Sequence, residues 1–460
     1  MRSACRVLQS VDCCRPETPR SGSRSRRPAG TDPGLIPAFW SAVDTCNRPP
    51  GETRVPGKSS PDVVRVTPRR PIRVCLVAPS LDILGGQAVQ AVRLLRGFGH
   101  VPSVAVGFVP INPRIPGLLG LLQRVRYVRT AVTWLRYVWT LVRRLAAYDV
   151  VHVFAASYAS FLLAPTPAVL LAKWYGKRVV LNYHSGEAED HLERWRRSAI
   201  PVVRLADALV VPSGYLVDVF ARFGLRARVV ANIVDLDQFQ FRARRPLRPV
   251  FLSNRNFEAH YNVACVLRAF ALIQNRYRDA RLIVAGDGSQ RRQLQRLADE
   301  LQLVNVAFVG RVSPDHMPSL YAAADVYLNA PDIDNMPGSI LEAFASGLPV
   351  VTTDAGGIPY IVRHGETGLL VPRGNHEGIA AAAIRLLQDA SLSERLVGSA
   401  REECRRRYTP EPVLREWVRV YRALVADGMA GKAEFTAQPA RQLADTAEMV
   451  ENQARPLSLR

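Results

Sequence analysis

The sequence predicts an α/β protein in which two doubly wound, Rossmann-like domains face each other across a cleft. Short runs rich in β-branched residues alternate with longer helical segments, a pattern typical of parallel sheets covered by helices. A break at residues 236–249, which contains Pro246 and Pro249, separates two sets of strand candidates. The length of 460 residues suits two domains with tails, because single hydrophobic cores stop growing well below that size.

The strand candidates follow the chain in the order that two such domains require. The first set comprises residues 72–79, 103–109, 149–155, 178–184, 207–213 and 227–232. The second set comprises residues 250–254, 280–286, 305–310, 324–330, 348–354 and 368–372. Ligands of open parallel sheets bind beyond the carboxyl ends of the strands, so two such domains place a cleft between them.

The chain divides into five predicted parts. These are a disordered Arg/Pro-rich tail (1–70), an N-terminal Rossmann-like domain (71–244), a C-terminal Rossmann-like domain (245–408), a helix crossing back to the N-terminal domain (409–430) and a loose tail (431–460). The first tail is rich in Arg, Pro, Ser and Gly, and such a segment buries too little apolar surface to offset the entropy of ordering it.

Composition favours anionic partners without choosing among them. The formal net charge is +21, and only four of the 61 basic residues are lysine. A basic surface attracts nucleic acid, acidic lipid headgroups or phosphorylated ligands. The seven cysteines form no CxxC pair, which argues against a zinc framework or a disulfide scaffold and favours a reducing, cytoplasmic setting. The N-terminus lacks the apolar core of a secretory signal, and no apolar stretch of spanning length occurs.

Residues 118–146 form a basic amphipathic stripe with two open interpretations. On a helical wheel, Arg126, Arg129, Arg136, Arg143 and Arg144 share one arc. The opposite arc holds Trp134, Leu135, Val138, Trp139, Val142 and Leu145. The helix either packs this apolar arc on the sheet or lies on the headgroups of an anionic membrane, on the inner face of the cytoplasmic membrane.

Two segments carry residues typical of a ligand site. Gly85 and Gly86 follow the first strand and precede a helix, where backbone without side chains lets an anionic ligand approach the helix amides. Asp334 and Glu342 flank the start of a second helix near Gly338, within YLNAPDIDNMPGSILEAFASGLPVVTTDAGGIP. Two carboxylates beside helix amides can accept several hydroxyl groups while the amides face an anion.

This second segment, together with AGDG (285–288), VAFVGRVS (306–313) and GETGLLVP (365–372), resembles the retaining family 4 glycosyltransferases of the GT-B fold. The family signature is a carboxylate, seven residues and a glutamate. The resemblance extends over residues 72–425. It implies transfer of a sugar from a nucleotide-diphosphate sugar to a glycan or lipid-linked acceptor, with no other cofactor and no metal. It also implies that residues 71–244 form the acceptor-side domain and that residues 245–408 form the nucleotide-sugar-binding domain.

The resemblance also implies roles for individual residues. Glu342 would bind the ribose hydroxyls, and Asp334, with the amides of Met336 and Gly338, would hold hydroxyls of the donor sugar. Arg255 would neutralise the diphosphate leaving group, a task for which a preorganised charge suffices. Gly310 to Val312 would meet the nucleotide base. His184 would lie near the anomeric centre and orient hydroxyl groups. Together with Gly85 and Gly86, these residues form the predicted site.

The sequence departs from the family pattern in four places. Asp334 replaces a glutamate, and Met336–Pro337 replaces phenylalanine–glycine, so that one backbone amide is missing. The lysine expected about six residues after Arg255 is absent, and His260 and Tyr261 occupy that region. The segment ANIVD (231–235) and Tyr360 also differ from the family. These departures indicate a divergent branch.

Three other functions compete with sugar transfer. The altered carboxylate and the missing lysine leave open a non-catalytic member that binds sugar nucleotide or membrane. A nicotinamide oxidoreductase is disfavoured, because this sequence has no GxGxxG motif after the first strand. Specific nucleic-acid binding rests only on charge, and we expect none.

Overall fold

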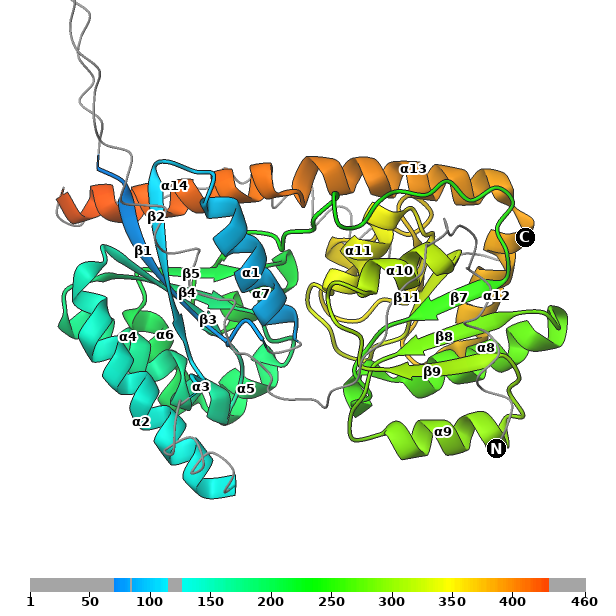
Figure 1. Ribbon diagram of the computed structural model, residues 1–460, viewed down its shortest axis with the longest axis horizontal. Coiled ribbons are helices and arrows are strands. Elements are labelled where there is room, and N and C mark those ends of the chain that lie inside the picture. The colour runs from blue at the N-terminus through cyan, green and yellow to red at the C-terminus, as the bar shows by residue number, and fades with distance from the viewer. Residues whose placement is uncertain (1–69, 83–84, 115–125, 430–460) are drawn as a thin grey trace, which may run out of the picture. The chain divides into compact units, whose positions relative to one another are not determined.

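Two six-stranded parallel sheets organise the protein. The computed structural model describes residues 70–82, 85–114 and 126–429 (Figure 1). Both sheets are flanked by helices, which confirms the predicted α/β class with two doubly wound domains. The predicted tails at residues 1–70 and 431–460 lie outside the described residues, apart from Arg70, and so do residues 118–125 of the basic stripe.

The first sheet has the order β2-β1-β3-β4-β5-β6. Its strands are β1 (Ile72–Ala78), β2 (Val104–Pro110), β3 (Val150–Ala155), β4 (Arg178–Tyr183), β5 (Ala208–Val211) and β6 (Arg228–Val229). Its helical segments are α1 (Gly86–Phe98), α2 (Arg126–Arg144), η2 (Leu145–Ala147), α3 (Ala159–Leu163), α4 (Pro165–Trp174), α5 (Ala188–Arg194), α6 (Arg196–Leu205) and α7 (Gly214–Arg222).

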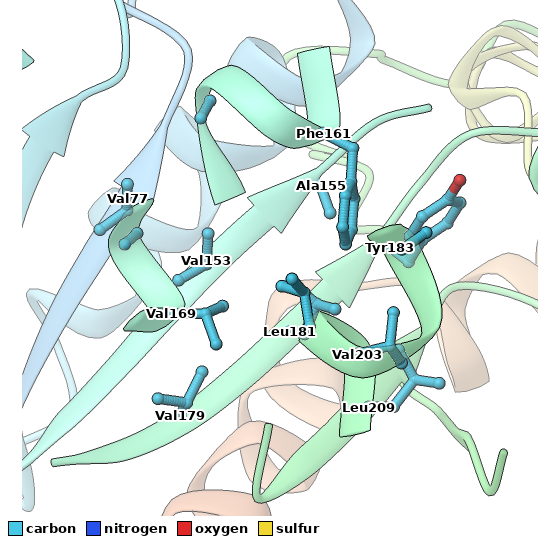
Figure 2. Packing of buried hydrophobic residues seen from close by; sticks show 14 of the residues in the cluster. Val77, Val153, Ala155, Phe161, Val169, Val179, Leu181, Tyr183, Val203 and Leu209 are labelled. Carbon is cyan, nitrogen blue, oxygen red and sulfur yellow. The ribbon is translucent and has the colours of Figure 1, made fainter. Parts of the chain in front are cut away.

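Helices cover both faces of this sheet, so its central strands are buried along their length and not on alternate residues only. All six residues of β3 are buried. Figure 2 shows one side of this core, where Val153 and Leu181 of neighbouring strands meet Val169 of α4 and Val203 of α6.

The second sheet has the order β12-β11-β10-β7-β8-β9. Its strands are β7 (Val250–Ser253), β8 (Arg281–Ala285), β9 (Val306–Gly310), β10 (Val326–Asn329), β11 (Val350–Thr353) and β12 (Leu369–Val371). The helical segments of this half are η3 (Ala259–Tyr261), α8 (Val263–Arg276), α9 (Arg291–Glu300), α10 (Met317–Ala323), α11 (Gly338–Ser346), η4 (Ile358–Tyr360), α12 (His376–Gln388) and α13 (Ala390–Arg407), after which the chain continues into α14 (Pro410–Met429).

Each sheet has one point at which the direction of strand addition reverses. In the first sheet this point lies between β1 and β3, and in the second it lies between β7 and β10. The connections leaving such neighbouring strands run to opposite sides of the sheet and leave a crevice at the carboxyl ends, where ligands of this architecture bind. The segments after β1, β7 and β10 contain Gly85, Arg255 and Asp334 respectively.

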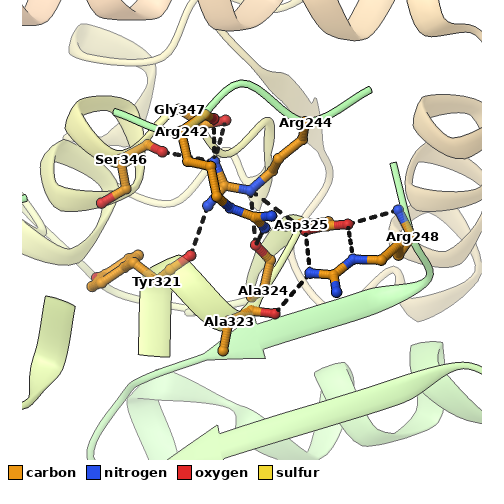
Figure 3. Close-up of polar contacts among 9 residues, drawn as sticks. All are labelled: Arg242, Arg244, Arg248, Tyr321, Ala323, Ala324, Asp325, Ser346 and Gly347. Atoms are coloured by element: carbon orange, nitrogen blue, oxygen red, sulfur yellow. Dashed lines mark hydrogen bonds and ion pairs between the residues drawn. The ribbon is translucent and has the colours of Figure 1, made fainter. Parts of the chain in front are cut away.

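An arginine cluster anchors the segment that enters the second sheet. Asp325, just before β10, is buried and forms ion pairs with Arg242, Arg244 and Arg248 (Figure 3). Arg244 also donates to the carbonyl oxygens of Tyr321, Ala324 and Ser346. Burial lowers the pKa of Arg244 to about 10, and neighbouring arginines add to that effect. The carboxylate therefore offsets the cost of burying a guanidinium.

Helix α14 packs against the first sheet. Its buried residues Val413, Trp417 and Tyr421 join the core formed by β1, β3 and α1. The Tyr421 hydroxyl lies 2.7 Å from Nδ1 of His152 in β3. The last helix of the described chain thus belongs structurally to the first sheet.

Helix α2 corrects one interpretation of the basic stripe. Its buried residues are Tyr137 and Leu141, followed by Leu145 in η2. The Tyr137 hydroxyl donates to the carbonyl oxygen of Ala164 at 2.7 Å, which fixes the rotation of the helix. The prediction that the opposite apolar arc packs on the sheet is therefore wrong for four of its members, which are exposed: Trp134, Leu135, Trp139 and Val142.

Candidate active site

One pocket of about 500 Å³ collects most of the predicted site residues. Its lining contains nine of the ten: Gly85, Gly86, His184, Arg255, Val312, Asp334, Met336, Gly338 and Glu342. Gly310 is not part of the lining. It ends β9 with a φ of 74°, and its carbonyl oxygen accepts from the amide of Gly286. Gly310 therefore shapes the turn that leads to Val312.

Arg255 and Asp334 meet above the reversal point of the second sheet. Arg255 follows β7 and Asp334 follows the neighbouring β10, and their side chains form an ion pair of 2.5 Å. The guanidinium of Arg255 also lies 4.1 Å from the ring centre of Tyr261 and donates to the Ser339 hydroxyl at 3.2 Å. Burial lowers the pKa of Arg255, but the facing Asp334 carboxylate and the nearby tyrosines Tyr261, Tyr321 and Tyr327 together raise it overall. Arg255 is thus a permanent, buried positive charge.

Glu342 lies on α11, one turn beyond Gly338. One carboxylate oxygen accepts from Arg93 at 2.9 Å, and the other accepts from the Tyr321 hydroxyl at 3.1 Å. The amide of Asn254 donates to the same hydroxyl at 2.8 Å. This network fixes the rotamer of Glu342 in the pocket wall.

His184 follows the end of β4 and enters the pocket from the first sheet. Its ring stacks on Phe154 with centroids 4.9 Å apart. Burial lowers the pKa of His184 to about 4, so its imidazole is neutral near pH 7. A neutral imidazole can donate to or accept from a hydroxyl group.

Four buried polar atoms at the pocket have no hydrogen-bond partner among the described residues: His184 Nε2, Asn254 Oδ1, Arg255 Nε and Asn335 Nδ2. Buried polar atoms are normally paired, and a cluster without partners needs an explanation. A polar ligand could pair with them only after a small movement of the pocket wall, because none of the four atoms is exposed to the pocket.

Glycine backbones shape two walls of the pocket. A Cβ added to Gly85 or Gly86 would meet no protein atom within 4 Å, so space is open beside both residues. Gly356, with φ of 50°, packs against Asp334, where an added Cβ would lie 2.2 Å from the carbonyl oxygen. The glycines after β11 therefore let two loops approach closely enough to position Asp334.

The described residues contain no group of three or more Cys, His, Asp or Glu side chains arranged to hold a metal ion. They also contain no helix that is long and apolar enough to cross a bilayer.

Sequence reasoning missed several residues of the pocket. Arg93 lies on α1, 249 positions before Glu342, and no local pattern marks it. Asn254 and Tyr261 lie near Arg255 in the sequence. The prediction made for Arg255 could therefore have been extended to the loop that contains all three residues. Asn335 follows Asp334 directly, and its side-chain oxygen accepts from Ser213 of the first half.

Comparison with known proteins adds independent support. The sequence model for Glycosyltransferase Family 4 matches residues 62–238, and the model for Glycosyl transferases group 1 matches residues 236–403. Together the two models span most of the chain.

Individual relatives are distant. The N-acetyl-alpha-D-glucosaminyl L-malate synthase of Bacillus anthracis is 32% identical over 38% of this chain and 46% of its own length. The alignment thus spans less than half of that relative. The phosphatidyl-myo-inositol mannosyltransferase of Mycolicibacterium smegmatis is 26% identical over 78% of this chain and 95% of its own length.

A solved structure shares the fold over nearly the whole described chain. Anabaena Alr3699/HepE, crystallised with UDP-glucose, superposes with a TM-score of 0.62 at 17% sequence identity, and the match covers 76% of this chain and all of that one (100%). The two matching family models, with this shared fold, assign the chain to the family 4 glycosyltransferases of the GT-B fold.

Proposed function

We propose that the protein transfers a sugar from a nucleotide-diphosphate sugar to a glycan or lipid-linked acceptor, with retention of anomeric configuration and without a metal. The observation that carries this proposal is the convergence of Arg255, Asp334, Glu342 and His184 on one pocket at the carboxyl ends of both sheets. Family membership supports the reaction class.

Arg255 is the residue best suited to the departing diphosphate. It is largely buried, permanently charged and held by Asp334, Tyr261 and Ser339, so it needs little reorganisation when negative charge develops. With the open glycine backbone at Gly85 and Gly86, it offers positive charge from protein groups alone. This arrangement supports a metal-independent reaction.

The two carboxylates, Glu342 and Asp334, would bind different parts of the donor, the ribose and the transferred sugar. Glu342 has its rotamer fixed by Arg93 and Tyr321, as a group that binds a ribose diol requires. Asp334 and the amides of Met336 and Gly338 lie beside it and would hold the sugar hydroxyls. Val312 would meet the base, with Gly310 shaping the turn before it.

Retention requires the acceptor to attack from the side on which the diphosphate leaves. His184 faces Arg255 and Asp334 from the first sheet and is neutral near pH 7, so it would orient a hydroxyl group of donor or acceptor. It would not serve as the nucleophile in this arrangement.

The names of relatives support the partner classes. One neighbour was solved with UDP-glucose, which supports a sugar nucleotide as donor. One relative is a phosphatidyl-myo-inositol mannosyltransferase, which supports an acceptor with a lipid part. We also propose that the protein acts in the cytoplasm, as a peripheral protein on the inner face of the cytoplasmic membrane.

A thermal-shift panel of sugar nucleotides tests the donor site, because a ligand that binds the folded state raises its melting temperature. One sugar nucleotide should raise the melting temperature of the parent and of Glu377→Gln, an exposed carboxylate on α12, but not that of Glu342→Gln. No shift with any sugar nucleotide, or equal shifts in all three proteins, would refute the assignment.

Transfer of the sugar to an acceptor then separates the enzyme from a non-catalytic member. Donor binding without hydrolysis or transfer in the parent would favour the non-catalytic alternative. Equal turnover in the parent and in Glu342→Gln would show that the reaction does not need Glu342.

A further inference from the structure

The exposed apolar side chains of the protein are concentrated in one short stretch. Among the described residues, sixteen large hydrophobic side chains are exposed, and nine of them lie between residues 128 and 174. These nine are Val128, Trp134, Leu135, Trp139, Val142, Leu162, Leu163, Leu170 and Trp174. Three of them are tryptophans, and Trp174 is the most exposed at 76%.

These side chains belong to three helices that pack beside one another: α2, α3 and α4 (Figure 1). Tyr137 of α2 donates to the carbonyl oxygen of Ala164, between α3 and α4. Tyr175, at the end of α4, donates to the carbonyl oxygen of Val142 at 3.0 Å. Trp134 and Leu163 line one shared hollow together with Arg129. The nine residues therefore belong to one region of the surface, the α2–α4 face.

The α2–α4 face is also strongly basic. Arg129, Arg136, Arg143 and Arg144 are exposed on α2, and within the described residues none of them forms an ion pair. Two of these guanidinium groups, those of Arg136 and Arg143, lie 4.8 and 4.4 Å from the ring of Trp139.

Acidic residues are nearly absent from the same stretch. Asp149 is the one acid between residues 126 and 186, and it pairs with Arg73 at 2.8 Å. The face thus combines unpaired positive charge with tryptophan and leucine at its surface.

We propose that the α2–α4 face docks on the surface of an anionic lipid bilayer. Tryptophan and leucine beside arginine suit the boundary between headgroups and acyl chains, where apolar groups leave water and cations meet lipid phosphates. A nucleic acid would satisfy the arginines but leave the leucines in water. An exposed apolar area of this kind on a soluble domain marks an interaction site.

This inference deepens the proposed function by naming the partner surface, and it rests on that function only for its biological meaning. Docking would place the acceptor-side domain where a lipid-linked acceptor resides. Vesicle binding does not require sugar transfer. If no sugar nucleotide shifted the melting temperature, the transfer proposal would be refuted, but the membrane-docking proposal would not be affected.

Co-sedimentation of the full chain with vesicles tests the proposal. The vesicles contain phosphatidylcholine alone or phosphatidylcholine with phosphatidylglycerol. The test variant is Leu135→Ser with Arg136→Gln on α2. The matched control is Leu272→Ser with Arg268→Gln on α8, which changes the same exposed residue types in the second half. All three proteins keep the same arginine-rich first 69 residues, so any binding by that segment cancels in the comparison.

We expect the parent and the α8 control to sediment with acidic vesicles and to remain in solution with neutral ones. The α2 variant should lose at least about fivefold in partitioning, because one basic group near an anionic surface contributes roughly that factor. Added salt should weaken the binding of the parent.

Three results would overturn the proposal. The parent could fail to distinguish acidic from neutral vesicles, or the α2 variant could bind as well as the parent, or both variants could lose binding equally. A fourth outcome, a parent dimer in sedimentation velocity that the α2 variant abolishes, would assign the face to a second copy of the chain instead.

Discussion

The guanidinium of Arg93 donates to the carboxylate of Glu342 at 2.9 Å, and both side chains are largely buried. Arg93 lies on α1 of the first sheet, whereas Glu342 lies on α11 of the second half. The same guanidinium donates to the carbonyl oxygen of Ile233 at 2.7 Å. One arginine thus joins the helix after the glycine pair, the segment after β6 and the carboxylate assigned to the donor ribose.

Replacing Arg93 by alanine should destabilise the protein by about 3–5 kcal/mol, because Glu342 would keep a buried charge without its partner. The double variant with Glu342→Gln should lose less than the two single losses combined, since it leaves no unpaired charge. Denaturant unfolding measures both values. Arg96→Ala, an exposed arginine on the same helix, should change the free energy of unfolding by no more than about 0.5 kcal/mol. Additive losses would show that the pair contributes no coupling.

Arg255→Gln should weaken the binding of a nucleoside diphosphate by roughly tenfold or more, since a hydrogen bond to a charged group contributes about 1.5–3 kcal/mol. Arg255→Lys should recover only part of this affinity, because an ammonium group lacks the planar stacking on Tyr261. Isothermal titration with UDP and GDP provides the measurement. Unchanged affinity for UDP and GDP in both variants would show that Arg255 does not bind the diphosphate.

Asp325→Ala should unfold more easily, by about 3 kcal/mol or more, without changing the donor affinity of the folded protein. Three arginines would lose a buried carboxylate that lies outside the pocket lining. Glu394→Ala, whose carboxylate pairs with Arg245 on the surface, should cost only about 0–1 kcal/mol. Denaturant unfolding and UDP titration of all three proteins separate the two effects. A large loss of UDP affinity in folded Asp325→Ala would contradict a purely structural role.

The sequence predicted the elements that local pattern determines. Both sheets, the start of α11 at Gly338 and the two carboxylates around it follow from strand runs, turn residues and the signature spacing. The contact between Arg93 and Glu342 could not be predicted, because it depends on how two distant helices meet.

The prediction of which face of α2 packs on the sheet was wrong for a different reason. The buried pair Tyr137 and Leu141 and the neighbouring arc around Trp139 are both apolar on a wheel, so periodicity alone does not choose between them. The choice is made by tertiary contacts, above all by the hydrogen bond of Tyr137 to Ala164.

Acid should destabilise the protein between pH 6.5 and about 3 through the buried, neutral His152. His152 is fully buried between Trp417 and Phe154, and its ring nitrogens face the Tyr421 hydroxyl and the Asn182 amide. Burial lowers the pKa of His152 to about 3, with a smaller contribution from His184. His152 therefore binds a proton near pH 6.5 in the unfolded chain but stays neutral at that pH in the folded protein. The free energy of unfolding falls as the pH falls through this window.

The variant His152→Gln isolates this contribution, since glutamine does not titrate. The free energy of unfolding of the parent should fall relative to that of the variant by up to about 1.4 kcal/mol per pH unit below pH 6.5. Carboxylates with lowered pKa, such as Asp325 and Glu403, act mainly at lower pH and are common to both proteins. His100→Gln, at an exposed position, is the matched control for the same substitution outside the core. Denaturant unfolding at a series of pH values gives the curves, and parallel curves for the parent and His152→Gln would show that His152 is protonated as easily in the folded protein as in the unfolded chain.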